Sequence, residues 1–511
     1  MTGSGPGGSE PDWRGNVLEF LRLAIGRIAA ITVDVGRSAA SREAAHKQER
    51  VVGMISLLLL SLALGLTGVV LSIHSSHAET MSDALARAYR SNPDLNQQRA
   101  AVRANDETVP QATAAYRPTV GLTGQYGVTH FATSGAGPGL NTLTDPGSLA
   151  LTVTQTVFNG NRNYNGVRQA ESRVFSAREF LRNTEGAVLQ NGAIAYMNVL
   201  RDTAILDLRK NNIIVLEEQL RQTRDRFNVG EVTRTDVAQA ESSLASARSD
   251  YFTAQADLQT SIANYRQVIG TQPRRLQPAR SIEALLPRTL QAAIAVGLTE
   301  HPTVQAALHA ADAAALQVKL AEGALYPTMT VSGRVERDWN YFYQPGVKAF
   351  NGAVMGQVSI PLYTGGAVDA QVRQAKELYT QARIQADLQR DAVRAAVVTS
   401  WGLLQSAKAA IQSNEAAVKA AEIALEGVRE EAKVGQRTTL DVLNAQQTLL
   451  NARVSLVSAQ RDRVVASYVV MASVGRLGAS NLRLNVSQYD PTVHFDQVKD
   501  KWFGLRTPDG R

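Results

Sequence analysis

Four stretches of the chain alternate apolar and polar residues, which indicates β-strands with one apolar and one polar face. In the first stretch the apolar positions are Val120, Leu122, Tyr126 and Val128. The same period of two recurs over residues 149–154, 328–341 and 354–362. This pattern fits either a transmembrane barrel with a wet lumen or a soluble sandwich with one buried face. Four strands cannot close a membrane barrel, whose minimum is about eight, so a barrel would need several chains.

Long helical stretches alternate with these strands. Residues 162–228 form one uninterrupted helical run, and the spacing predicts a second over about 367–432. Each would extend about 100 Å at 1.5 Å per residue. The returning helices are shorter and are predicted over 235–270, 288–323, 437–475 and 81–115. Stacked in pairs they match the long helices in length, which predicts four helical columns per chain.

The returning helices carry apolar residues at alternating steps of three and four. The series runs from Val237 through Ala240 and Leu244 to Leu258, and again from Val442 to Ala459. This spacing predicts coiled-coil packing, and the frequent alanine lets helix axes approach closely. Packing accounts for the stripe, so we assign it no cofactor role.

The chain is duplicated. Residues 167–170 (VRQA) recur at 372–375, Val229-Gly230 recurs as Val434-Gly435, and Asp236-Val237 recurs as Asp441-Val442, each 205 residues later. Several motifs at one offset indicate a tandem repeat. The predicted domains are a leader (1–78), repeat 1 (79–280, strands about 117–158, turn 229–236), repeat 2 (281–482, strands about 326–363, turn 434–441) and an equatorial or disordered tail (483–511).

The leader has the parts of a secretory signal. Arg42, Lys47 and Arg50 precede an uncharged apolar run at 51–72, and Ser76-His77-Ala78 resembles a cleavage site. Cleavage there would leave Glu79 as the mature N-terminus. The run is also long enough to span a bilayer, so an uncleaved anchor is the alternative.

Composition narrows the chemistry. The net charge of +7 is spread along the helices, and no basic cluster with interleaved aromatics predicts nucleic-acid binding. The absence of cysteine excludes disulfides and thiolate chemistry. The seven histidines lack metal-ligand spacing, and no phosphate loop or nucleophile–base pair occurs. We therefore predict no enzyme, no catalytic residue, no metal and no cofactor.

The two turns, RFNVGEVTRTDV (226–237) and AKVGQRTTLDV (432–442), together with the two repeats, resemble the TolC-like outer-membrane efflux protein family. The resemblance covers roughly residues 79–482. It implies an α+β membrane protein that trimerises into a 12-stranded β-barrel and an α-helical tunnel extending into the periplasm. It further implies an outer-membrane exit duct of a tripartite efflux pump or type I secretion system.

The implied partners are two further copies of the chain, a periplasmic membrane-fusion adaptor, an inner-membrane transporter of RND or ABC type, and outer-membrane lipid. The cargo would be drugs, other small molecules or polypeptides. The alternative is a non-pore periplasmic adaptor or structural coiled-coil protein. An adaptor normally has one long hairpin, whereas this chain has two hairpins and amphipathic strands.

The turns are the candidate site. Glycine at 230 and 435 permits the positive φ that ends a helix, and Thr235 with Asp236, like Thr439 with Asp441, is predicted to cap the next helix. The resemblance implies a periplasmic gate at Thr235, Asp236, Arg437 and Asp441. Arg437 would reach Asp236 on a neighbouring hairpin. The pattern departs from the family at Ala432 and Asn444. The predicted adaptor-docking tip is Val229, Gly230, Glu231, Val434, Gly435 and Gln436.

Overall fold

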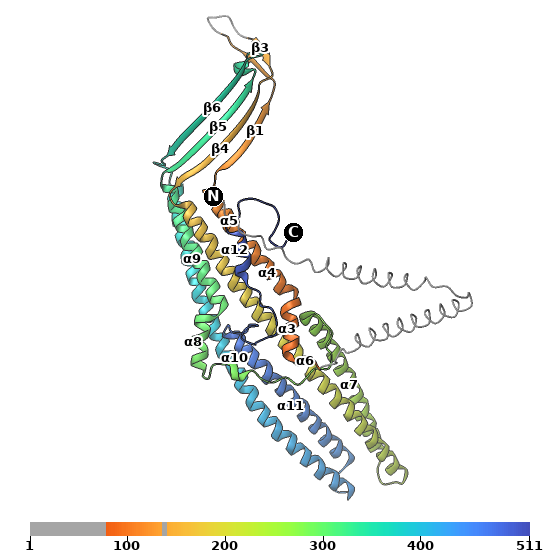
Figure 1. The fold of residues 1–511 in the computed structure, drawn as a ribbon. Coiled ribbons are helices and arrows are strands. Elements are labelled where there is room, and N and C mark those ends of the chain that lie inside the picture. The colour runs from red at the N-terminus through yellow and green to blue at the C-terminus, as the bar shows by residue number, and fades with distance from the viewer. Residues whose placement is uncertain (1–77, 135–140, 511) are drawn as a thin grey trace, which may run out of the picture. The chain divides into compact units, whose positions relative to one another are not determined.

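The coordinates are those of a computed structural model, which describes residues 78–134 and 141–510. The predicted leader lies almost wholly outside the described residues. Within residues 78–510, which form one compact unit, a β-sheet lies at one end and two helical hairpins lie at the other (Figure 1).

Two long helices connect these ends. They are α6 (Arg162–Asn228) and α10 (Ala367–Lys433), each of 67 residues. Each is followed by a returning helix, α7 (Arg234–Ile269) or α11 (Thr439–Ser473). These bounds agree within about two residues with the predicted ones. The duplicated sequence has therefore produced a duplicated hairpin.

The two helical segments nearer the sheet, residues 288–323 and 81–115, differ from the prediction. Each was predicted as one continuous helix, and each is interrupted in the structure. Residues 288–323 form α8 (Leu290–Glu300) and α9 (Pro302–Glu322). Residues 81–115 form α3 (Met81–Ser91), α4 (Pro93–Asp106) and α5 (Thr108–Thr113). Prolines at 93 and 302 explain the main breaks, because the residue before proline is pushed out of helical geometry. Asn92 and His301 accordingly have ψ of 127° and 128° and cap the helices that follow.

The main sheet is antiparallel in the order β1-β4-β5-β6. Its strands are β1 (Thr119–Tyr126), β4 (Gly147–Asn159), β5 (Thr328–Trp339) and β6 (Lys348–Ser359), so each repeat contributes one hairpin. A small two-stranded sheet, β2 (Thr129–Ala132) and β3 (Asn141–Thr144), extends the first hairpin. Short 3-10 turns lie at Ala114–Tyr116, Glu283–Leu285, Gly323–Leu325 and Tyr341–Tyr343.

The strand register gathers the apolar residues on one face. Val120 pairs with Val153, Leu122 pairs with Leu151, and Leu151 pairs in turn with Val335. All five of these side chains are exposed. A soluble sandwich would bury such a face, so the exposed apolar surface favours the membrane interpretation.

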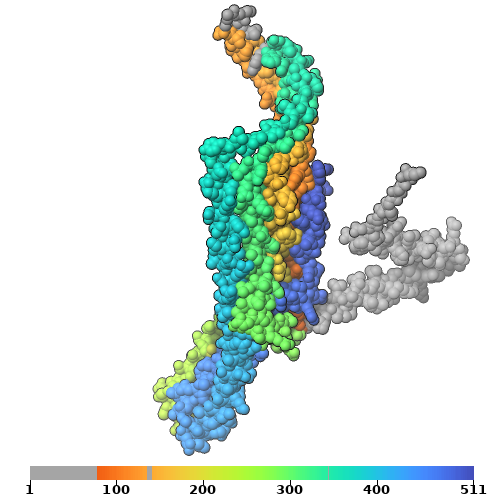
Figure 2. Space-filling model, turned by 90° about the vertical axis from the view of Figure 1, so that its left-hand side faces the viewer, coloured from red at the N-terminus to blue at the C-terminus, as the bar shows by residue number. Residues whose placement is uncertain are grey.

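The largest core cluster joins both repeats near the middle of the helical part. It contains residues from α3, α6, α7 and α11, with Leu85, Leu189, Tyr196 and Ile269 almost fully buried. Figure 2 shows α10, α9 and α6 as neighbouring columns beneath the sheet, with the C-terminal segment beside them. That segment includes α12 (Pro491–Val498), which packs against α4.

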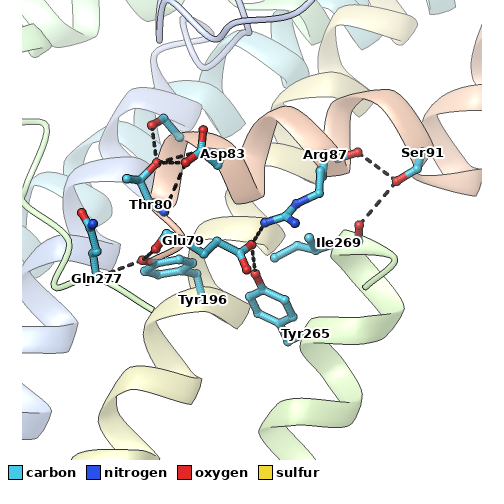
Figure 3. Close-up of polar contacts among 10 residues, drawn as sticks. Glu79, Thr80, Asp83, Arg87, Ser91, Tyr196, Tyr265, Ile269 and Gln277 are labelled. Carbon is cyan, nitrogen blue, oxygen red and sulfur yellow. Dashed lines mark hydrogen bonds and ion pairs between the residues drawn. The ribbon is translucent and has the colours of Figure 1, made fainter. Parts of the chain in front are cut away.

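Glu79, the predicted mature N-terminus, is built into this core (Figure 3). Its carboxylate accepts a hydrogen bond from the Tyr265 hydroxyl and forms an ion pair with Arg87. Its carbonyl oxygen accepts from Tyr196 at 2.8 Å and from the amide of Gln277 at 2.9 Å. The first described residues therefore tie α3 to α6 and α7.

In residues 78–134 and 141–510, no helix is both long and apolar enough to span a bilayer.

Candidate functional site

The first tip turn closes α6 with a Schellman motif. Gly230 has a φ of +83°, its amide donates to the Phe227 carbonyl at 3.0 Å, and the Glu231 amide donates to the Arg226 carbonyl at 2.9 Å. A left-handed residue followed by these two bonds satisfies carbonyls that the helix end leaves free. The predicted role of Gly230 in ending the helix is confirmed.

The second tip turn repeats this geometry 205 residues later. Gly435 has a φ of +79°, its amide donates to Ala432 at 3.2 Å, and the Gln436 amide donates to Glu431 at 2.9 Å. Around both glycines the space for a Cβ atom is open. A larger residue would therefore strain the backbone without a steric clash.

The N-caps of the returning helices differ from the predicted ones, and this corrects the capping assignment. The N-caps are Thr233 and Thr438, whereas Thr235 and Thr439 lie inside the helices. Each cap is reciprocal: the Asp236 amide donates to the Thr233 hydroxyl oxygen at 3.3 Å, and the Thr233 amide donates to the Asp236 carboxylate at 2.9 Å. The signature was present as threonine followed three residues later by aspartate.

The capping bonds also set the charge state of the two aspartates. Hydrogen bonds from the Thr233 hydroxyl and amide lower the pKa of Asp236. Hydrogen bonds from the amide and hydroxyl of Thr438 likewise lower the pKa of Asp441. Both carboxylates are therefore ionised at neutral pH, at the helix N-termini where negative charge is favoured.

Arg437 finds its partner within its own hairpin. Its Nε donates to the Glu431 carboxylate at 2.7 Å, and Glu431 raises the pKa of the guanidinium. Within one protomer the structure gives no contact between Arg437 and Asp236. A contact between Arg437 and Asp236 across neighbouring hairpins stays a prediction. The Glu431 partner was missed, although it lies only one turn before the glycine.

The predicted docking residues occupy the outermost part of each turn. Val229 and Val434 end α6 and α10 with 73 % and 72 % of their surface exposed. Glu231 is bound to Arg226 at 3.0 Å, and the second turn carries Gln436 in its place. Each turn thus presents an exposed valine beside polar groups.

Equivalent polar pairs link the two helices of each hairpin. Arg248 and Glu217 are 2.7 Å apart in the first hairpin, and Arg453 and Glu422, which stand 205 residues later, are 2.8 Å apart. Nearer the tip, Arg224 bonds to Glu241 at 2.5 Å. The matching pair in the second hairpin is Arg429 with Gln446 at 3.2 Å. The predicted coiled-coil stripes lie between the helices, with Ala240, Leu244, Val442 and Leu449 buried.

Near the tips, Leu443 joins the two hairpins. Leu443, near the start of α11, is 6 % exposed and packs into the cluster of Leu216, Leu220, Ala240 and Leu244 in the first hairpin. The corresponding residue of repeat 1 is Ala238, which is exposed. Sequence reasoning missed Leu443 because it lies beside the regular stripe and buries against the other repeat.

The sheet has a polar face opposite the exposed apolar one. Gly121, Thr152 and Arg334 lie in one register row, and Thr123, Ala150 and Glu336 lie in the next. Arg334 donates two hydrogen bonds to Glu336, at 3.1 and 2.7 Å. The face opposite the exposed apolar surface is therefore hydrophilic. Among the described residues no group of three or more acidic or histidine side chains has the geometry of a metal site.

Comparison with known proteins decides between the duct and the adaptor. The model of the family described as "Outer membrane efflux protein" matches residues 84–271 and 294–476. The chain belongs to this family. As an outer membrane efflux protein it carries the match twice, once over each repeat.

Relatives of this outer membrane efflux protein align over most of their length. Outer membrane efflux protein BepC of Brucella suis biovar 1 is 43 % identical over 89 % of this chain and 98 % of its own. Outer membrane protein TolC of Escherichia coli is 25 % identical over 82 % of this chain and 87 % of its own. The outer membrane channel CmeC of Campylobacter jejuni has the same fold, with a TM-score of 0.70 over 82 % of this chain and 89 % of its own at 15 % identity.

Family membership places this efflux protein in the outer membrane, with its helical part extending into the periplasm, and makes it an exit channel. The adaptor interpretation is therefore wrong, because the family match spans both hairpins and the strands that precede them.

Proposed function

We propose that three copies of the chain assemble into one outer-membrane duct, with a shared 12-stranded barrel and a tunnel of helical columns. The observation that carries this proposal is the four-stranded sheet with exposed apolar residues on one face and polar residues on the other. Its outer strands, β1 and β6, each lack a partner on one side among the described residues. In lipid such edges are not tolerated, because unpaired backbone groups find no water there.

Closure by neighbouring copies removes the edges. Four strands fall below the minimum of about eight for a membrane barrel, and three copies supply twelve. The polar face bearing Arg334 and Glu336 then lines the lumen, and the face bearing Leu151 and Val335 meets lipid. The number three comes from the family resemblance.

The duct carries drugs, other small molecules or polypeptides outward. We infer that a periplasmic membrane-fusion adaptor docks at the tips and that an inner-membrane transporter of RND or ABC type supplies the energy. Val229 and Val434 support the docking role, since both are apolar, exposed and identically placed. The channel itself contributes no catalytic residue to this proposal.

The tips also form the proposed periplasmic gate. Asp236 and Asp441 bring negative charges to the first turn of the two returning helices, and Arg437 brings a positive charge just before the N-cap of α11. Threefold symmetry would repeat these charges around the pore. Thr235 lies on the same turn. Arg437 is held by Glu431 in the isolated protomer, so gate formation requires that it exchange or share this partner.

Single-channel recording tests the duct directly. Purified protein added to a planar bilayer should give stepwise conductance of one size class, because each assembly has one pore. Absence of channels from protein that remains folded and membrane-inserted would contradict the proposal.

Docking needs a separate test. Gly230→Val and Gly435→Val should abolish adaptor cross-linking and transport while leaving channels intact, since only the turn conformation is strained. Gly427→Val is the matched control, because Gly427 lies in α10 with open space around it and no positive φ. Transport that survives both turn substitutions would exclude the tips as the docking surface.

A further inference from the structure

The end of the chain lies at the base of the sheet. Arg117, two residues before β1, donates from Nη1 to the Lys501 carbonyl at 2.7 Å, and its guanidinium carbon lies 4.6 Å from the centre of the Trp502 ring. In Figure 1 the segment after α12 loops beside α5, close to the start of β1. The last residues therefore reach the level at which the chain enters the strands.

The segment that leads there is fixed along its length. The Tyr489 amide donates to the Tyr89 hydroxyl at 3.0 Å, and Arg99 lies against the rings of both tyrosines. His494 then contacts the fully buried Asp106 at 3.0 Å. These contacts to α3 and α4 define where residues 499–506 are placed.

At this position the chain exposes three large apolar side chains within four residues. Trp502 is 68 % exposed, Phe503 is 89 % exposed, and Leu505 is exposed completely. The Lys501 ammonium donates to the Arg506 carbonyl at 2.6 Å, which closes a short loop with the apolar residues between two cationic ones. An apolar group of this kind is unfavourable in water.

Exposed aromatic residues at this end of the strands indicate what the loop binds. Tyr116 lies three residues before β1, Tyr326 lies two residues before β5, and Tyr363 lies four residues after β6. All three side chains are exposed. Aromatic residues at both ends of the strands form the interfacial girdles of outer-membrane proteins. Trp502 lies at the same end of the sheet, because it contacts Arg117 two residues before β1. Cations beside such residues attract the phosphates of lipid headgroups.

We propose that the loop formed by residues 501–506 is a phospholipid contact, in which Trp502, Phe503 and Leu505 enter the headgroup region of the periplasmic leaflet. Lys501 and Arg506 face the phosphates. The proposal rests on membrane insertion of the sheet, as proposed above. It adds a membrane contact outside the strands, made by a part of the chain beyond the two family-matched segments.

Tryptophan fluorescence tests this contact in the full chain. The chain has four tryptophans, at 13, 339, 401 and 502. A variant that keeps only Trp502, with phenylalanine at the other three positions, is placed in nanodiscs of phosphatidylethanolamine and phosphatidylglycerol. Doping with phosphatidylcholine brominated at carbons 6 and 7 should strongly quench Trp502 and shift the remaining emission. Quenching should be weaker with bromines at carbons 11 and 12, because the contact is shallow.

Two matched variants make the result decisive. A chain that keeps only Trp339, exposed on β5, should be quenched if the sheet is inserted, and this checks the proposed barrel separately. A chain that keeps only Trp401, partly buried in α10, should not be quenched. Quenching of Trp339 without quenching of Trp502 would overturn the lipid contact and leave the barrel standing.

The aqueous quencher acrylamide then identifies what replaces lipid in that case. Trp502 shielded from both quenchers would mean that a second copy of the chain covers the loop. Trp502 open to acrylamide would mean that the loop lies in water. Either result contradicts the proposal. Replacing Lys501 and Arg506 by glutamine should weaken the bromolipid quenching, and more so in discs that contain anionic phosphatidylglycerol than in neutral discs. Unchanged quenching in both kinds of disc would refute the assigned phosphate contact.

Discussion

The two hairpin tips share one backbone but carry different side chains. Both end their long helix with a left-handed glycine and begin the returning helix with a threonine–aspartate capping box. They differ at the ion pair, which is Arg226 with Glu231 in one turn and Arg437 with Glu431 in the other. The duplicated features are those that any such turn needs, so they report on folding.

Other residues of the two hairpins differ because they make different contacts in the two repeats. Leu443 of the second hairpin is buried against the first, while its counterpart Ala238 is exposed. The packing between hairpins is thus one-sided within a protomer. We infer that the surface around Ala238 faces a neighbouring copy in the assembled duct, and that the tip of the second hairpin can be loosened by changing the Leu443 contact.

Removing the Leu443 side chain should have the largest effect. A buried leucine replaced by alanine typically costs about 2–5 kcal/mol, here in the packing of α11 on the first hairpin. We expect Leu443→Ala to raise single-channel conductance and to speed hydrogen exchange in the first turns of α11. Leu440→Ala is the control, because Leu440 is exposed one turn away. Equal behaviour of the two variants would show that the hairpins are not held together at this point.

Removing either capping box should destabilise its helix by a smaller amount, which should be similar at the two tips. Thr233→Ala and Thr438→Ala should each cost about 1 kcal/mol of helix stability, seen as faster hydrogen exchange in the first turn of α7 or α11. Since the geometry is duplicated, the two losses should be similar. A large difference would mean that one tip is stabilised by contacts outside its own turn.

Acidification should remove the stability that the capping boxes give to α7 and α11. The pKa values of Asp236 and Asp441 lie below the ordinary carboxyl value of 3.8 because hydrogen bonds favour their charged forms. Their stabilisation is therefore complete above pH 3.8 and is lost as pH falls through the lowered pKa. Exchange at both tips should quicken only below pH 3.8, and each threonine variant should show less of this change at its own tip.

The smallest effects should come from the exposed ion pair of Arg437 and Glu431. Variants of its members distinguish two possible partners of Arg437 in the closed gate. Arg437→Ser should raise conductance without loss of the assembly. If the latch is the contact seen within the hairpin, Glu431→Gln should match Arg437→Ser. If Arg437 reaches a neighbouring hairpin, Asp236→Asn should match it instead, and the amide oxygen would still accept from Thr233. If Arg437→Ser leaves the conductance unchanged, Arg437 is not part of the gate.

Asp441→Asn should alter selectivity with little change in conductance. The substitution removes a charge from the tip and keeps an acceptor for the Thr438 amide, which now donates to the carboxylate at 3.0 Å. We expect weaker cation selectivity and weaker block by multivalent cations, measured from reversal potentials and titrations. Unaltered selectivity would show that Asp441 acts only as a cap.

Most of the protomer could be predicted from the sequence because its signals are local and occur twice. The long helices, the strand faces and the glycine turns follow from periodicity and from positive φ. The breaks at Asn92 and His301 could have been found from the prolines that follow them. Leu443 and the Arg437–Glu431 pair depend on how chain segments meet in space, which periodicity along one helix does not report.

The central claim is that the four-stranded sheet is one third of a barrel, and the mass of the detergent-extracted protein tests it most directly. Light scattering coupled to size exclusion, corrected for bound detergent, should give three chains per particle. Heating before electrophoresis should convert this species to the single chain. A monomer that stays soluble without detergent would contradict the account.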